Sequence, residues 1–349
     1  MPRMDNDDSG RLSRARLLLI ADGKYGKSYY AGMAGAHFNV LYLDGDVAAE
    51  TIQQLPAAVR RNIYLLSVGD TIDSGRIDHN NADFLTSFFT ESTLLWDDTR
   101  QKLVSRKDDL SESEVWEIKP AKMDNNTVLV IDSWTTAVMS LMQWAADAEG
   151  VDLMDTDSPE MRPIYAAGGN KATQWLRIIE ALPCHVIVVA HPDEFVKQEK
   201  PTGRVKDAKE GDMKVLWTKM VPKSTSKPHS LTMAKFFTDV AWLEASPTGT
   251  TRYINFRISD ERISGGHYND RIEMEKRWFH DLVKQLGGIV PDKAPEPSEW
   301  LTMYAKGEWR PPEPKVLAAG KDSKMDVKPV AKTMASLTAV KGFPKKQTS

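Results

Sequence analysis

Residues 21–28, with the sequence ADGKYGKS, constrain this chain more than any other segment. They follow an apolar run at residues 17–20 and precede residues with helical spacing, so strand, loop and helix come in that order. Glycines in such a loop let backbone N–H groups approach anionic oxygens at the start of a helix. We therefore predict a phosphate-binding loop of the P-loop type. The alternative is a turn that carries Gly-Lys-Ser by chance.

The positions of this loop have separate expected roles. Gly23 and Gly26 leave room for a phosphate, Lys27 reaches the β- and γ-phosphates of ATP, and the Ser28 hydroxyl ligates Mg²⁺. Ala21 stands where the consensus has its first glycine, and it is the smallest substitute. The predicted cofactors are ATP and Mg²⁺. The predicted nucleotide contacts are Asp22, Gly23, Lys24, Tyr25, Gly26, Lys27, Ser28 and Tyr29.

Short apolar runs alternate with helical patterns over residues 14–272, which predicts an α/β core whose mainly parallel central β-sheet is flanked by helices. Four further strands are expected at 40–43, 63–68, 127–131 and 185–190. Helices are expected at 48–60, at 81–104, from the end of the strand at 127–131 to about 148, and at 166–182. Residues 240–244 and 252–258 read as a β-hairpin, and 273–290 contain an amphipathic C-terminal helix.

The remaining segments lack a core-forming pattern. We expect a flexible polar leader at 1–13, an exposed insertion at 105–126, a basic loop region at 193–235 and a mostly disordered basic tail at 291–349. A net charge of −3 gives no overall attraction to nucleic acid, so any such binding requires a local basic patch. The single cysteine, Cys184, excludes an internal disulfide and fits a cytoplasmic location. No apolar run approaches the length of a membrane span, so no membrane association is expected.

Acidic residues follow two of the predicted strands. Asp132 ends the run VLVID, where an acidic residue is expected to hold the magnesium ion of a nucleotide site; a helix cap is the alternative role. Asp44 and Asp46 follow the second strand, and either is a candidate to orient the attacking water. His191 ends the run at 186–190, where a polar side chain can sense the γ-phosphate, although a purely structural histidine fits equally well.

The order of these segments, 21–28, 40–46, 128–133 and 186–191, resembles the RecA-like P-loop ATPases, in particular compact phage-encoded members that act in single-strand annealing and recombination. The resemblance covers residues 17–271. It implies DNA-dependent ATP hydrolysis and a ring or filament of identical subunits with nucleotide between them. For a phage-encoded protein it also implies a location in the host cytoplasm. In that family the acid after the second strand is usually Glu and acts as the catalytic base, which by position is the shorter Asp46. The family's sensor corresponds to His191.

The family's DNA-contacting loops correspond to residues 197–235, a segment that contains ten basic and four acidic residues. Such a segment suits a phosphate backbone, and Trp217, Phe236 and Phe237 lie close enough in sequence to stack bases. A solvated surface loop flanked by buried aromatics is the alternative. The predicted DNA-binding residues are Lys206, Lys214, Lys219, Lys223, Lys227 and Lys235.

An ATPase that works between subunits also needs a cation that reaches a neighbour's γ-phosphate, and the candidates are Arg257, Arg262 and Arg271. The leading hypothesis is an ATP-dependent recombination ATPase that binds single-stranded DNA. The alternatives are a P-loop motor or switch acting on a protein, a small-molecule kinase, and a binding module with an inactive site. The tail is a candidate to dock onto a replication or single-strand-binding protein.

Overall fold

The computed structural model of this protein describes residues 14–46, 48–73, 76–151, 153, 161–199, 214–297 and 299–311. The predicted leader, Lys206, and the predicted tail from residue 312 onward lie outside these ranges. None of the helices in the described ranges is both long enough and apolar enough to cross a membrane.

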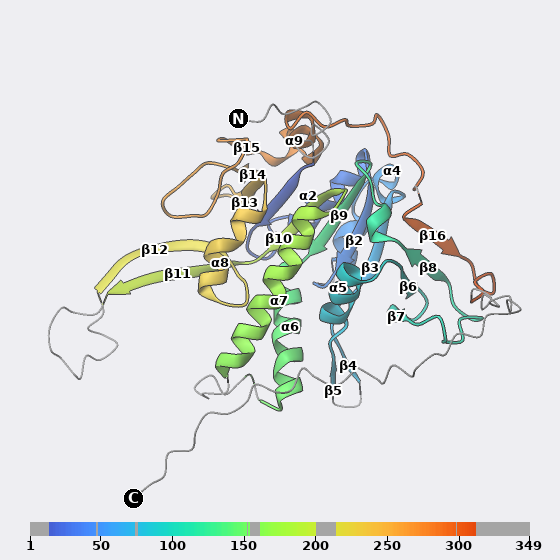
Figure 1. Cartoon of the computed structure of the whole chain (residues 1–349). Coiled ribbons are helices and arrows are strands. Elements are labelled where there is room, and N and C mark those ends of the chain that lie inside the picture. Colours follow the sequence, from blue (N-terminus) through green and yellow to red (C-terminus); the bar gives the residue numbers. More distant parts are fainter. Residues whose placement is uncertain are drawn as a thin grey trace, which may run out of the picture. The chain divides into compact units, whose positions relative to one another are not determined.

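An eight-stranded sheet has the order β15-β14-β13-β1-β10-β9-β2-β3 (Figure 1). Six neighbouring strands are parallel, from β13 to β3, and two antiparallel strands extend the sheet beyond β13. The predicted α/β class with a mainly parallel central sheet is therefore confirmed. The strands are β1 (Arg16–Ile20), β2 (Asn39–Asp44), β3 (Ile63–Ser67), β9 (Thr127–Asp132), β10 (His185–Ala190), β13 (Asp239–Ala245), β14 (Arg252–Asn255) and β15 (Arg271–Glu273).

The central strands are buried on both faces, because helices cover each side of the sheet. Alternate residues of β1 enter different hydrophobic clusters, with Leu18 on one face and Leu17 on the other. The Leu18 face is covered by α5 (Asn80–Thr90), α6 (Trp134–Glu149) and α7 (Met161–Ala181). The Leu17 face is covered by α2 (Lys27–Gly32), α3 (Ala49–Gln53), α4 (Ala57–Arg60) and α9 (Phe279–Gln285). Because the six strands from β13 to β3 run parallel, their carboxyl ends meet at one edge of the sheet.

A second, four-stranded sheet has the order β16-β8-β6-β7 and consists of β6 (Leu94–Asp97), β7 (Lys102–Val104), β8 (Val115–Ile118) and β16 (Leu301–Tyr304). It corrects three expectations. The helix expected at 81–104 ends at Thr90, the insertion at 105–126 contributes β8, and the segment expected to be disordered contributes β16. Long-range packing explains these differences, because Trp96 and Trp300 are fully buried in the main core although neither segment has a periodic pattern.

Two other segments also differ from expectation. Residues 193–235 hold a two-stranded antiparallel ribbon of β11 (Pro192–Glu199) and β12 (Lys214–Pro222), followed by α8 (Lys227–Met233), instead of one long loop. The helix expected from 273 begins only at Phe279, because Ile272 pairs with Ile254 in the sheet. The predicted hairpin is confirmed as β13 and β14. A small hairpin of β4 (Thr71–Asp73) and β5 (Arg76–Asp78) completes the elements of the described residues, together with four short 3₁₀ turns at Met33–Ala36, Pro120–Lys122, Ala234–Phe236 and Met274–Lys276.

Candidate active site

The loop after β1 turns into α2 at Gly26, which precedes the first helical residue and has φ +88°. This left-handed conformation favours glycine, because a side chain there is strained. A side chain at this position would also meet a neighbour, since a Cβ atom on Gly26 would lie 2.7 Å from Nη1 of Arg252. Backbone conformation and close packing therefore both require glycine at this position.

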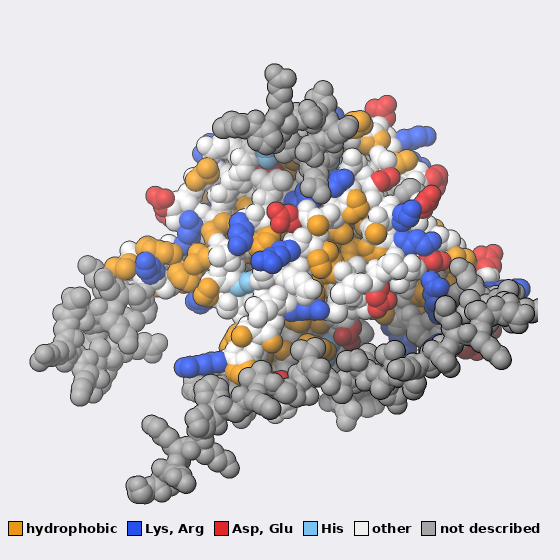
Figure 2. Space-filling view, viewed as in Figure 1, with side chains coloured by type: hydrophobic (Ala, Val, Ile, Leu, Met, Phe, Trp, Pro, Cys, Tyr) orange, Lys and Arg blue, Asp and Glu red, His pale blue; other side chains and the backbone are white. Residues whose placement is uncertain are grey.

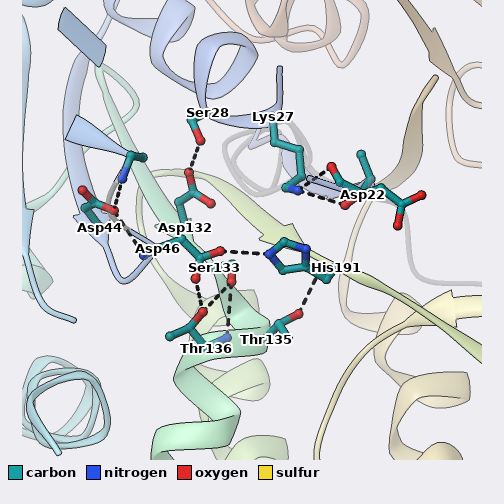
Figure 3. A network of polar contacts seen from close by, with 12 residues as sticks. Asp22, Lys27, Ser28, Asp44, Asp46, Asp132, Ser133, Thr135, Thr136 and His191 are labelled. Carbon is teal, nitrogen blue, oxygen red and sulfur yellow. Dashed lines mark hydrogen bonds and ion pairs between the residues drawn. The ribbon is translucent and has the colours of Figure 1, made fainter. Parts of the chain in front are cut away.

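The Lys27 side chain is buried and turns back along the loop. Its Nζ donates to the carbonyl oxygens of Ala21 at 2.9 Å and Asp22 at 2.8 Å (Figure 3). Burial lowers the pKa of Lys27, and the carboxylates of Asp132, Asp46 and Asp22 act in the opposite direction. An ammonium group has three donors, so one remains for an anionic oxygen beside the loop.

Ser28 and Asp132 are in direct contact although β10 separates their strands. The Ser28 hydroxyl donates to Oδ2 of Asp132 at 2.6 Å, and the buried Tyr42 hydroxyl donates to the same oxygen at 2.5 Å. Burial raises the pKa of Asp132, whereas these two hydrogen bonds lower it. Sequence reasoning did not identify Tyr42, because a tyrosine inside an apolar strand reads as a core residue. The arrangement leaves Oδ1 of Asp132 without a hydrogen bond from another described residue.

The two aspartates after β2 have different surroundings. Asp44 is buried and accepts hydrogen bonds from the backbone N–H groups of Asp46, Ala48 and Ala49, so its carboxylate holds the turn between β2 and α3. Asp46 instead accepts hydrogen bonds from side chains, one from Thr136 and one from Nε2 of His191 at 3.0 Å. Figure 3 shows both aspartates, but of the two only the Asp46 carboxylate contacts Thr136, after β9, and His191, after β10.

The pKa of Asp46 reflects two opposing effects. Burial raises it, but hydrogen bonds from His191, Thr136 and Ser133 outweigh burial and leave the pKa below its ordinary value. Asp46 is therefore a carboxylate near neutral pH. An ionised carboxylate is the form that accepts a proton from water or orients it.

His191 connects this network to the ribbon. Its backbone N–H donates to Thr135 Oγ1 at 2.9 Å, and its carbonyl accepts from the backbone N–H of Lys223 at 2.8 Å. The ribbon starts at the next residue, Pro192, which pairs with Pro222. The structure thus brings the loop lysine, Ser28, Asp132, Asp46 and His191 to one edge of the sheet.

The predicted trans-acting arginines lie on the antiparallel side of the sheet. Arg262 and Arg271 both form ion pairs with Glu244, the second at 2.7 Å. Burial raises the pKa of Glu244, but hydrogen bonds from Asn255 and these two arginines outweigh burial and leave the pKa below its ordinary value. Arg262 also lines a cavity of about 330 Å³ together with Ala21 and Asp22 of the phosphate loop of the same chain. Arg257 is exposed, and its side chain forms no ion pair with another described residue.

The predicted DNA-binding lysines are spread over several elements. Lys219 lies on β12, and Lys223 lies at the root of the ribbon. Lys227 Nζ donates to the Glu194 carbonyl of β11 at 2.8 Å. Lys235 follows the ribbon by thirteen residues and lies over the ring of Phe236, which is buried in the core and so is not exposed for the base stacking expected of it. Lys214 begins β12, but its side chain lies outside what the structure describes.

The chain matches one family model, described as an AAA domain, over residues 13–222. This match covers more than half of the chain and includes the loop, the acidic strand ends, His191 and the ribbon. No curated protein matches the chain. The matched residues include the phosphate-loop sequence and five strands of the central sheet, β1, β2, β3, β9 and β10. The chain therefore belongs to the AAA-domain family of P-loop ATPases.

Proposed function

We propose that this protein is an ATP-dependent recombination or annealing ATPase that binds single-stranded DNA through the β11–β12 ribbon. In the proposed reaction, water attacks the γ-phosphorus and the bond to the ADP oxygen breaks, giving ADP and phosphate. Asp46 orients the water and accepts its proton, and Lys27 stabilises the charge on the phosphate oxygens. His191 holds Asp46 in place through their 3.0 Å hydrogen bond.

The residues at this edge fit a magnesium ion bound together with nucleotide. Magnesium prefers oxygen ligands and in nucleotide sites takes one or two protein groups, with phosphates and water completing the shell. The Ser28 hydroxyl and the Asp132 carboxylate, 2.6 Å apart, supply such oxygens. No group of three or more metal-ligating His, Cys, Asp or Glu side chains occurs among the described residues, which suits an ion that arrives with ATP. When bound, the ion neutralises phosphate charge.

The arrangement of aromatic and basic side chains on one face of the ribbon supports DNA as the partner. Cross-strand partners share a face in an antiparallel pair, and Phe195 pairs with Lys219 while Lys197 pairs with Trp217. The rings of Phe195 and Trp217 lie 5.3 Å apart, so two aromatics and two lysines alternate on this face. Single-stranded nucleic acid is bound by this combination, because bases stack on aromatic rings while cations contact phosphates.

The ribbon is also exposed. Trp217 is 40% exposed, and Val215 and Leu216 beside it are 51% and 42% exposed. The ribbon projects from the sheet in Figure 1, and Figure 2 shows hydrophobic side chains with a basic side chain along it. Large exposed apolar side chains that cluster on one element are typical of binding surfaces. Because the ribbon follows His191 directly, DNA bound there would lie next to the hydrolytic network.

The experiment is ATP hydrolysis by the full-length protein with and without single-stranded DNA, repeated over a series of salt concentrations. We expect DNA to stimulate hydrolysis and the stimulation to weaken as salt rises, because phosphate contacts release counterions. Lys27→Ala should remove both basal and stimulated hydrolysis. Hydrolysis that depends on Lys27 but is unaffected by DNA would instead favour a P-loop motor or switch that acts on a protein.

Assembly into a ring or filament remains part of this proposal. Since Glu244 engages both Arg262 and Arg271, Arg257 is the arginine whose side chain is best placed to serve a neighbouring subunit. The predicted contact between the tail and a replication or single-strand-binding protein also stays a proposal. Sedimentation and hydrolysis, each measured with ATP and DNA for wild type and Arg257→Ala, test assembly and the trans arginine. Loss of a trans cation should reduce hydrolysis without reducing assembly.

A further inference from the structure

Arg252 lies against the phosphate loop, and no motif in the sequence marks it. A Cβ atom on Gly26 would be 2.7 Å from its Nη1, 3.4 Å from its Cζ and 3.5 Å from its Cδ. The end of this side chain thus lies directly beside the Gly26 backbone, at the turn into α2. A smaller or differently placed residue at 252 would leave this side of the loop open.

The charge of Arg252 has no partner within the part of the chain that the structure describes. Its side chain forms no hydrogen bond, ion pair or ring contact with another described residue. Two other arginines on this side of the sheet differ in this respect, because Arg262 and Arg271 share Glu244. A half-buried guanidinium without an anion is unusual, since a cation out of water is normally paired. The position of Arg252 therefore points to an anion from outside the chain.

Strand order places Arg252 opposite the hydrolytic residues. Asp132, Asp46 and His191 follow β9, β2 and β10, which all lie on one side of β1. Arg252 begins β14, two strands away on the other side, and its partner Ala245 shows that it shares a face with Leu243 and Ile254, which pack with α2. The γ-phosphate must lie near the hydrolytic residues. Arg252 therefore lies on the side of the loop where the rest of the nucleotide leaves it.

We propose that Arg252 binds the phosphates that ADP and ATP share, as a second nucleotide-contacting cation contributed by the same chain as Lys27. A guanidinium presents several donors in one plane and can engage two phosphate oxygens at once. This inference rests on the proposal that residues 21–28 hold the nucleotide phosphates. It is independent of DNA binding and of assembly.

The test is the affinity for ADP in EDTA, measured by calorimetry for wild type, Arg252→Met and Arg252→Lys. Methionine keeps much of the packing beside Gly26 without the charge, and the expected result is a loss of about tenfold or more in affinity, with lysine between methionine and wild type. A non-hydrolysable ATP analogue should lose the same factor as ADP. Arg60→Ala is the matched control, because Arg60 is an exposed arginine on α4.

Two results would overturn the inference. In the first, ADP and analogue affinities of Arg252→Met equal those of wild type while Lys27→Ala weakens both, so that the loop is correct and Arg252 is a packing residue. In the second, Arg252→Met weakens the analogue but leaves ADP unchanged, so that the cation serves the γ-phosphate. If Lys27→Ala itself leaves ADP and analogue affinities unchanged, the phosphate-loop proposal fails and the inference fails with it. Equal thermal melting of the variants and wild type establishes that each variant is folded.

Discussion

The carboxyl edge of the sheet and the β11–β12 ribbon are one residue apart in sequence, at His191 and Pro192, yet they are built in opposite ways. At the sheet edge, Asp132 and Asp44 are 1% and 2% exposed, and each accepts at least two hydrogen bonds. On the ribbon, Trp217 is 40% exposed, and its ring contacts only Phe195 among the described aromatic residues.

This difference matches what we propose that each region binds. Stabilising a phosphoryl transfer requires charges that are already oriented, because reorientation during the reaction costs free energy. A flexible polymer of varying sequence instead requires rings and cations that adapt to it. The comparison predicts that substitutions at the sheet edge change hydrolysis, whereas substitutions on the ribbon change DNA affinity.

The largest difference between the effect on hydrolysis and the effect on DNA binding is expected from Lys27→Ala. Removing the cation from the loop should lower ATP hydrolysis on the order of 100- to 1,000-fold, because it stabilises charge that develops on the phosphates. Nucleotide-free binding of single-stranded DNA, measured by fluorescence anisotropy, should stay within about twofold of wild type. A parallel loss of DNA binding would show that the two regions are not independent.

Asp46→Asn and Asp44→Asn form a matched pair within the sheet edge. Asp46→Asn should lower kcat on the order of 100-fold with little change in KM, because it removes the group that accepts the proton from water. Asp44→Asn should instead lower the free energy of unfolding by about 1 kcal/mol, because it weakens buried hydrogen bonds to the turn before α3. Steady-state kinetics and urea denaturation of both variants check this assignment. The reverse pattern would make Asp44 the catalytic carboxylate.

Trp217→Ala tests the ribbon. Loss of one stacked ring should weaken single-stranded DNA binding about tenfold, and hydrolysis without DNA should be unchanged. Trp144 on α6 is the control, because it is 46% exposed and lies outside the ribbon. Anisotropy titrations at one salt concentration are sufficient. Equal losses for the two tryptophans would argue against a binding face that is specific to the ribbon.

The smallest effect is expected from Lys219→Ala. One phosphate contact fewer should weaken DNA binding only a few-fold at moderate salt and should lower the slope of log affinity against log salt by about 1. Lys107→Ala, an exposed lysine after β7, should leave the slope unchanged. A slope that is the same for wild type and Lys219→Ala would remove this lysine from the DNA contact.

Much of the hydrolytic edge could be predicted from the sequence. Residues 21–28, Asp132 and His191 each follow a buried strand, and parallel strands bring their carboxyl ends together whatever the details of packing. The residues alone left Asp44 and Asp46 both open, and the family resemblance pointed to Asp46. Contacts favour Asp46 for the proposed role, since Asp44 accepts three backbone hydrogen bonds whereas Asp46 meets Thr136 and His191.

The small sheet and the ribbon were not predictable in the same way. β8 and β16 are far apart in sequence, and both have polar neighbours, so their pairing depends on the burial of Trp300 in a core that is assembled elsewhere. The ribbon is stabilised by its own ladder and does not pack a full face against the core, so it lacks the hydrophobic alternation that identifies strands in a sequence.

The sequence by itself determined the α/β class and the phosphate loop, because an apolar strand, a glycine-containing turn and a helix each show as a short local pattern in the chain. Only the tertiary structure decided which side chains meet: Tyr42 with Asp132, Glu244 with two arginines, and Arg252 with Gly26. These contacts depend on strand order and on which face of a strand a residue occupies. Neither property is encoded in any single stretch of the chain.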